Sequence, residues 1–119
     1  MKALLDTNVL SDLLAGRKPM FRELRGYRQL CISRVGWLEL LCGAPDEARR
    51  VLWEDFLGQF VLHEIDGAVA REAVALRARR MMSLPDALVW ATARIHGLLL
   101  LTRDARAFPR NTPEIRILR

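Results

Sequence analysis

The chain has 119 residues and a mass of 13.6 kDa, a size typical of one compact domain. It is 51% hydrophobic and 28% charged, which excludes a disordered chain, and no apolar run approaches the roughly 20 residues of a membrane-spanning helix. The net charge is +5, with 17 arginines and two lysines. This balance favours a polyanionic partner such as nucleic acid, although a genomic preference for arginine codons accounts for it equally well.

The chain starts without a charged segment that leads into a long apolar stretch, so we expect no signal peptide. Cys31 and Cys42 lie among apolar residues and lack the spacing of a metal site. We interpret both as reduced core residues of a cytoplasmic protein.

Short apolar runs that end at turn residues predict strands, and apolar residues at helical spacing predict the helices between them. In chain order, we expect a strand at Ala3–Leu5, a helix from Val9 to Leu14, a short helix from Pro19 to Leu24, a strand at Leu30–Ser33, a helix at Val35–Cys42, a helix opened by Pro45, a strand at Phe60–Ile65, a helix at Ala68–Met81, a helix from Ser83 to His96, and strands at Leu98–Leu101 and Ile115–Leu118.

The alternation of strands and helices predicts an α/β fold with a five-stranded, mainly parallel sheet flanked by helices on both faces. The strands are apolar at consecutive positions, as expected when helices cover both faces of the sheet. We find no repeat or linker, so the prediction is one domain over residues 1–119.

Acidic residues follow the strands at the edge of the sheet where ligands bind in such folds. Asp6 comes directly after the first strand, and Asp104 follows the fourth. Asp86 lies in the first turn of the helix that leads into the fourth strand, and Glu39 lies within the helix after the second. We therefore expect these acids to converge on one end of the sheet.

Glu39 is the most informative of the four because of its neighbours. On a helix it shares a face with Val35 and Cys42 and lies beside Leu38. An ionised carboxylate on such an apolar face is costly unless it is paired or binds a metal. No basic residue occupies the neighbouring helical positions, which favours a functional role for Glu39.

The other acids also have structural explanations. Asp6 can cap the first helix, Asp86 fits a capping box with Ser83, and Asp104 can cap a turn. Four carboxylates in one cleft nevertheless repel one another and raise their pKa values, and a divalent cation removes that penalty. Oxygen ligands alone point to Mg²⁺ or Mn²⁺, and with a phosphate substrate to metal-assisted hydrolysis.

Four stretches of the chain, in a fixed order from end to end, carry a family resemblance: Leu4-Leu5-Asp6-Thr7-Asn8-Val9-Leu10, Ile32-Ser33 with Trp37-Leu38-Glu39-Leu40, Leu84-Pro85-Asp86-Ala87-Leu88 with Ala91-Thr92-Ala93, and His96-Gly97-Leu98 with Leu101-Thr102-Arg103-Asp104. Together they resemble the PIN domain, and specifically the small VapC-type toxins of bacterial toxin–antitoxin pairs.

The resemblance implies a Mg²⁺- or Mn²⁺-dependent endoribonuclease. By this resemblance the metal-binding and catalytic acids are Asp6, Glu39, Asp86 and Asp104, and the polar residues that support the site are Asn8 and Thr102. Many family members have Asn at the position of Asp104 and an Asp near Ala107. That second Asp is absent here, which leaves Asp104 as the candidate for its role.

The resemblance also implies a homodimer and a VapB-type antitoxin that inserts a C-terminal peptide. Trp37 and Trp53 are plausible anchors for such an interface, whereas we expect Trp90 to be covered within the domain. For the RNA backbone, we expect contacts from three arginines at the rim of the site: Arg17, Arg103 and Arg106.

Two alternatives remain open. One is a non-catalytic RNA-binding module on the same fold, and the other is a receiver-type signalling domain, which would need a lysine after the last strand. The sequence has no lysine after Lys18, which counts against the receiver. We expect no catalytic role for His63 or His96, and we interpret Asp12 as part of a solvated helix face.

Overall fold

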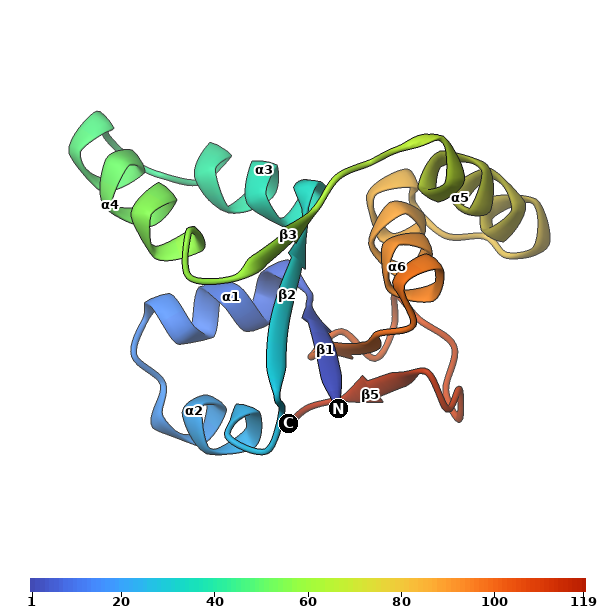
Figure 1. Cartoon of the computed structure of the whole chain (residues 1–119), viewed down its shortest axis with the longest axis horizontal. Helices are drawn as coiled ribbons and strands as arrows, with labels where there is room; N and C mark the ends of the chain where they lie inside the picture. Colours follow the sequence, from blue (N-terminus) through green and yellow to red (C-terminus); the bar gives the residue numbers. More distant parts are fainter.

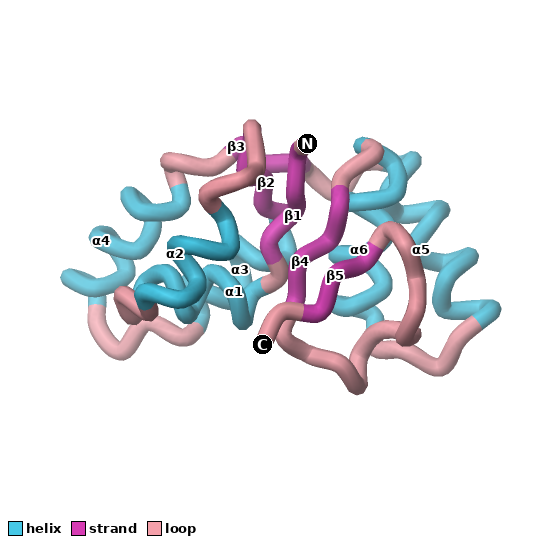
Figure 2. The backbone as a smooth tube through the Cα atoms, turned by 90° about the horizontal axis from the view of Figure 1, so that it is seen from below, coloured by secondary structure: helices cyan, strands magenta, loops and turns pink.

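The computed structural model describes residues 1–119. Its five strands form one parallel sheet in the order β3-β2-β1-β4-β5, with β1 at the centre. Figures 1 and 2 show the strands side by side between two groups of helices. The strands are β1 (Lys2–Leu5), β2 (Gln29–Ser33), β3 (Val61–His63), β4 (Leu99–Thr102) and β5 (Ile115–Ile117); the helices are α1 (Thr7–Leu14), α2 (Lys18–Leu24), α3 (Arg34–Cys42), α4 (Glu47–Leu57), α5 (Gly67–Arg79) and α6 (Leu84–His96).

Alternating residues of the strands face two separate cores. Leu4 packs with α5 and α6, whereas Leu5 packs on the other face with α1, α2 and α4 (Figure 1). Helix α3 begins at the carboxyl edge of the sheet and contributes Val35 to the first core and Leu40 to the second. The parallel α/β sheet with helices on both faces is thus as predicted, and no helix is long and apolar enough to cross a membrane.

The order of the strands is what brings the predicted acids together. Strand β4 lies beside β1, with Leu5 opposite Leu101, and the Asp6 N–H donates to the Leu101 carbonyl at 2.9 Å. The segments that follow β1 and β4 therefore leave the sheet at the same edge. The order also differs from the 2-1-3-4-5 order of receiver domains, so the receiver alternative is wrong.

Most predicted elements are confirmed, including the short α2, and Trp90 is buried as expected, with 2% of its surface exposed. The third strand is shorter than the predicted Phe60–Ile65. Cys31 is buried, but Cys42 is exposed, so its assignment to the core is wrong. Helix α3 runs outward from the end of β2 (Figure 1), and Cys42 at its far end lies beyond the cover of the sheet.

Candidate active site

Asp6 occupies the junction between β1 and α1 and is buried, with 7% of its surface exposed. As the N-cap of α1 it accepts a hydrogen bond from the Thr7 N–H on Oδ1, at 2.8 Å. Its other oxygen, Oδ2, accepts from the Thr102 hydroxyl at 2.7 Å and from Asn8 Nδ2 at 3.4 Å. The Thr7 N–H and the side chain of Thr102 on β4 together fix the orientation of this carboxylate.

Asn8 and Thr102 tie the two chain segments at the site to each other. Asn8 Nδ2 also donates to Thr102 Oγ1 at 3.3 Å, and Asn8 Oδ1 accepts from the Arg103 N–H at 3.0 Å. Thr102 Oγ1 in turn accepts from the Asp104 N–H at 3.0 Å. The two residues expected to support the site thus both contact Asp6.

Glu39 lies on the exposed side of α3 and accepts a hydrogen bond from Thr7 Oγ1 at 2.6 Å. Glu39 makes no ion pair, as expected, but the expectation that it lies on an apolar face is wrong. Because α3 extends past the sheet, Leu38 and Glu39 face solvent while Leu40 is buried. Glu39 nevertheless lies beside the start of α1, next to Asp6.

Asp86 and Asp104 are both held by local capping. Ser83, the N-cap of α6, accepts from the Asp86 N–H at 3.2 Å, which is one half of the predicted capping box. Asp104 Oδ1 accepts from the N–H groups of Arg106 and Ala107 at 3.0 and 3.1 Å. The second oxygen of Asp104 makes no hydrogen bond and faces an exposed surface.

Burial and neighbouring charges raise the pKa values of two acids at this edge of the sheet, Asp6 and Asp86. Burial raises the pKa of Asp6 most strongly; hydrogen bonds from Thr102 and Thr7 oppose this, and the charges of Asp86 and Glu39 raise it further. These surroundings disfavour the ionised form of the carboxylate, and a nearby cation would stabilise that form.

Asp86 shows the same pattern. Burial raises its pKa, a hydrogen bond with Ser83 lowers it, and the charges of Asp104 and Glu39 raise it again. The charges of Glu39, Asp86 and Asp104 thus each act on Asp6 or on Asp86, which shows that the four predicted acids lie near one another.

The set of donors fits a hard divalent cation, because it consists of carboxylate oxygens with no thiolate or imidazole. As placed, no three acidic, histidine or cysteine side chains are close enough together to hold a metal ion. Glu39 and Asp104 are exposed, and each accepts hydrogen bonds through one oxygen only, so the second oxygen of each is available to an ion.

The predicted rim arginines divide into two kinds. Arg17 and Arg103 both contact Asp12, with N–O distances of 3.3 and 2.7 Å, whereas the exposed Arg106 guanidinium makes no hydrogen bond or ion pair. Asp12 is buried, with 8% of its surface exposed, so its interpretation as a solvated residue is wrong. Its position one turn after Asn8, on the same face of α1, is the signal that could have revealed it.

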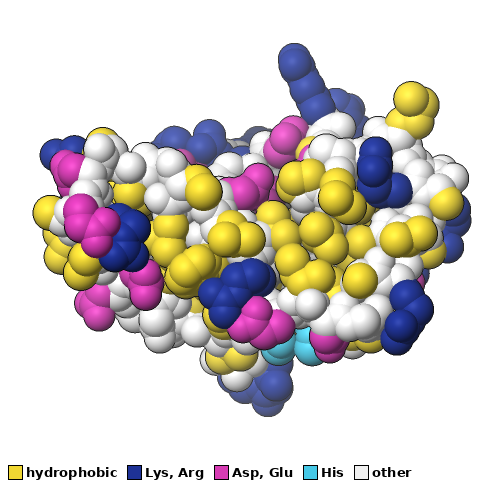
Figure 3. All heavy atoms as spheres, turned by 90° about the horizontal axis from the view of Figure 1, so that it is seen from above, with side chains coloured by type: hydrophobic (Ala, Val, Ile, Leu, Met, Phe, Trp, Pro, Cys, Tyr) yellow, Lys and Arg dark blue, Asp and Glu magenta, His cyan; other side chains and the backbone are white.

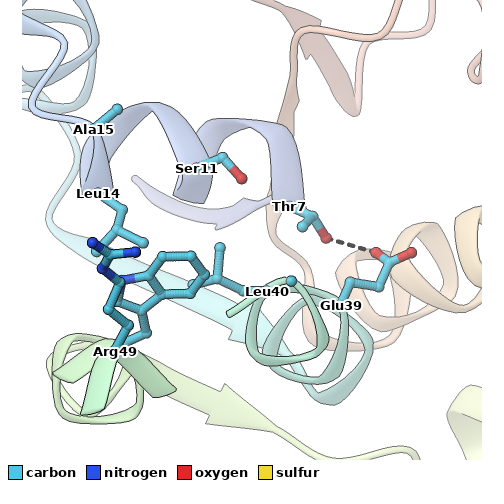
Figure 4. A pocket seen from close by; sticks show the side chains of 9 residues that line it. Thr7, Ser11, Leu14, Ala15, Glu39, Leu40 and Arg49 are labelled. Atoms are coloured by element: carbon cyan, nitrogen blue, oxygen red, sulfur yellow. Dashed lines mark hydrogen bonds between the residues drawn. The ribbon is translucent and has the colours of Figure 1, made fainter. Parts of the chain in front are cut away.

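A groove of about 500 Å³ leads away from the acids between α1, α3 and α4. Figure 4 shows Thr7 and Glu39 at one end, with Leu14 and Arg49 at the other. Trp53, one of the two expected interface anchors, lines this groove. Trp37 does not line the groove; it is half-buried beneath the Arg34 guanidinium, 4.6 Å from its ring centroid.

The two histidines lie apart from this chemistry. His63 and His96 stack on each other with ring centroids 3.9 Å apart. Burial lowers the pKa of His63, and His96 and Lys2 lower it further. Neither histidine contributes to the pKa shifts of Asp6 or Asp86.

The chain is similar to known proteins over nearly its whole length. The PIN domain family model matches residues 3–112. In sequence, the chain is 28% identical over 121 residues to a tRNA(fMet)-specific endonuclease VapC of Shigella flexneri, covering 92% of each. In structure, it is similar to a chain of a toxin–antitoxin complex from Klebsiella pneumoniae, with 35% identity and a TM-score of 0.87 over 96% of this chain and 95% of that chain. A chain of DNA-bound VapBC from Salmonella typhimurium has the same fold, with 24% identity and a TM-score of 0.81 over 99% of this chain and 97% of that chain.

Proposed function

The chain belongs to the PIN domain family, and from this premise we propose that it is a divalent-metal-dependent endoribonuclease and the toxin of a VapBC-type toxin–antitoxin pair. The observation that carries the proposal is the group of carboxylates at the carboxyl edge of the sheet, where burial and mutual repulsion raise the pKa values of Asp6 and Asp86. An arrangement that disfavours its own ionised form is suited to a cation.

We assign the binding of Mg²⁺ or Mn²⁺ to four residues, Asp6, Glu39, Asp86 and Asp104. When bound, such an ion polarises a phosphoryl group and lowers the pKa of water. The chain's own contribution is to orient the ligands. Thr102 and the Thr7 N–H hold the carboxylate of Asp6, and the Thr7 hydroxyl holds Glu39.

The RNA backbone would lie against the cationic rim of this site. Arg103 follows Thr102 directly, and its guanidinium is fixed on Asp12 through one nitrogen, which leaves its other N–H groups available to a phosphate. Arg106 is exposed and unpaired. The relative from Shigella flexneri is named for a tRNA substrate, so initiator tRNA is the first RNA to examine.

Two surfaces of the chain support the proposed protein partners, an antitoxin and a second copy of the chain. The groove that begins at Glu39 and ends at Trp53 suits the C-terminal peptide of a VapB-type antitoxin, which could block the acids from that side. Hydrophobic side chains also gather across the middle of one face (Figure 3), and the exposed apolar residues of the chain include Leu38 at 47% and Leu84 at 49% exposure. This supports a homodimer. An RNA substrate implies a cytoplasmic location.

The test is cleavage of RNA by the purified chain with Mg²⁺ or Mn²⁺, and again with EDTA. We expect EDTA to stop cleavage, and Asp6→Asn or Asp86→Asn to reduce it by more than about 100-fold, which exceeds the loss typical of an outer-shell partner. Asp55→Asn is the matched control, because Asp55 is exposed on α4 and its side chain makes no hydrogen bond. Binding of RNA without any cleavage by the wild type would instead favour the non-catalytic RNA-binding alternative.

A further inference from the structure

The short helix α2 and the residues that flank it form a cationic surface. Between positions 17 and 28 the chain has one acidic residue, Glu23, which is paired with Arg116 at 3.3 Å. All the basic side chains of this segment are exposed: Arg17, Lys18, Arg22, Arg25 and Arg28.

Most of this charge is not neutralised within the protein. Arg17 contacts Asp12, but the side chains of Lys18, Arg22, Arg25 and Arg28 make no ion pair or hydrogen bond. By contrast, Arg50 on α4 contacts both Glu47 and Glu54. A surface of uncompensated cations attracts a polyanion.

An aromatic ring lies among these cations. Phe21 is 50% exposed and lines a hollow of about 450 Å³ together with Lys18, Arg22 and Arg25. Single-stranded nucleic acid is bound by this combination, in which a base stacks on the ring and cations contact the flanking phosphates. A purely acidic peptide would use the charges but has no base to stack on the ring.

The cationic surface is connected to the candidate active site through Asp12. Arg17, at the N-terminal end of α2, and Arg103, at the end of β4, contact the two oxygens of this one carboxylate. The Arg103 N–H donates to Asn8, which contacts Asp6. A strand of RNA that leaves the acids along Arg103 therefore meets Arg17 and then α2.

We propose that α2 is a second RNA-binding surface, which holds a single-stranded segment of the substrate beside the segment that is cut. Phe21 stacks on a base, and Lys18, Arg22 and Arg25 contact the backbone phosphates. The inference rests on the proposed function for its substrate, but it concerns binding and can be measured without cleavage.

The experiment measures the Kd of a fluorescently labelled single-stranded RNA by anisotropy in EDTA, with an RNA of about 12 nucleotides, within the range of single-stranded binding sites. The test variants are Phe21→Ala and the pair Arg22→Gln/Arg25→Gln. The control is Arg71→Gln/Arg110→Gln, which removes the same charge at two exposed, unpaired arginines outside α2.

We expect each α2 variant to weaken binding by about ten-fold, the size of one lost base stack or of two lost phosphate contacts. The salt slope of log Kd should fall by about 1.4 in the arginine pair, because each contact to a single strand contributes about 0.7. The control should change Kd less than two-fold. Thermal melting of all variants checks that these exposed positions leave the fold intact.

A matched pair of cleavage assays then links the surface to the reaction. The ratio of kcat/KM for the long RNA to that for an oligonucleotide of about three nucleotides, shorter than the roughly 4–16 nucleotides of a single-stranded binding site, should fall in the α2 variants and not in the control. Equal loss of affinity in test and control pairs would overturn the proposal, since net charge alone would then explain binding. An unchanged Kd for RNA together with weakened binding of the antitoxin would also overturn it and would make α2 a protein-docking surface. Absence of cleavage by the wild type would refute the proposed function while leaving the Kd comparison decisive.

Discussion

Replacing Thr102 by valine removes one hydroxyl on which three contacts of the candidate site converge. This hydroxyl is fully buried; it donates to Asp6 Oδ2 at 2.7 Å and accepts from the N–H of Asp104 at 3.0 Å and from Asn8 Nδ2 at 3.3 Å. Valine has nearly the same shape, so the main loss is the hydrogen bond to the carboxylate. A bond to a charged group contributes about 1.5–3 kcal/mol, and the two N–H donors lie near solvent. We therefore expect a loss of about 2–3 kcal/mol in the free energy of unfolding.

The same variant should change the pH dependence of the reaction. The hydrogen bond from Thr102 lowers the pKa of Asp6 against the raising effect of burial. Without it the pKa of Asp6 rises further, so protonation removes the ionised ligand at a higher pH. The acid limb of kcat/KM, measured at a Mn²⁺ concentration well below saturation so that protons compete with the ion for Asp6, should shift upward. Urea unfolding in EDTA measures the stability change.

Thr102→Ser is the matched control, because it keeps the hydroxyl and removes only a buried methyl group, at a cost of about 1 kcal/mol. Its acid limb should coincide with that of the wild type. The reasoning is refuted if the valine and serine variants unfold at the same urea concentration and share one pH profile, since the hydroxyl would then have no special role at Asp6.

Three further predictions concern the acids. In EDTA near neutral pH, Asp86→Asn should be at least as stable as the wild type, because it removes a carboxylate that is disfavoured as an anion. Mn²⁺ at a hundred times its Kd should stabilise the wild type by about 2.7 kcal/mol, and Asp86→Asn should lose most of this stabilisation. Calorimetry measures both effects. Since folding raises the pKa values of Asp6 and Asp86, the stability they contribute is fully present below their unfolded-state values and is lost as the pH rises through the raised ones. In EDTA, the free energy of unfolding of the wild type should therefore increase relative to that of Asp86→Asn as the pH falls. A difference that stays constant with pH would contradict this. Asp12→Asn should lower the free energy of unfolding by about 1–2 kcal/mol, because it weakens the contacts of this buried carboxylate with the partly exposed Arg103 and Arg17. The exposed Asp55→Asn should change it by less than about 0.5 kcal/mol.

The fold could be predicted because its signals are local. Apolar runs mark the strands, and the residues that start the helices lie next to them in sequence; Asp6, Ser33 and Ser83 all cap helices at the positions where the pattern predicts a start. The convergence of Asp6 and Asp104 follows from the same reasoning, because both come after parallel strands and the register places those strands side by side.

The errors have a common origin in contacts that the local pattern does not contain. Asp12 is indistinguishable from a solvated helix residue until Arg103, 91 residues later, lies over it. Glu39 lies in the expected neighbourhood although the reason for expecting it there is mistaken, because helical periodicity shows which residues share a face but not where the sheet beneath that face ends. Cys42 fails for the same reason, since it lies at the end of α3 beyond the strands.

The capping and ligand roles of these acids, which compete as explanations in the sequence, are compatible in the structure. Asp104 uses Oδ1 for both N–H groups of its turn and leaves Oδ2 free. Asp6 accepts hydrogen bonds on both oxygens, but each oxygen of a carboxylate has two lone pairs. A helix or turn that starts at the carboxyl edge of a parallel sheet therefore fixes an acid by its backbone donors and still directs a lone pair into the cleft. Capping thus supplies the rigidity that a site for a small divalent ion requires, and finding an acid at a helix start in this fold is no argument against its catalytic use.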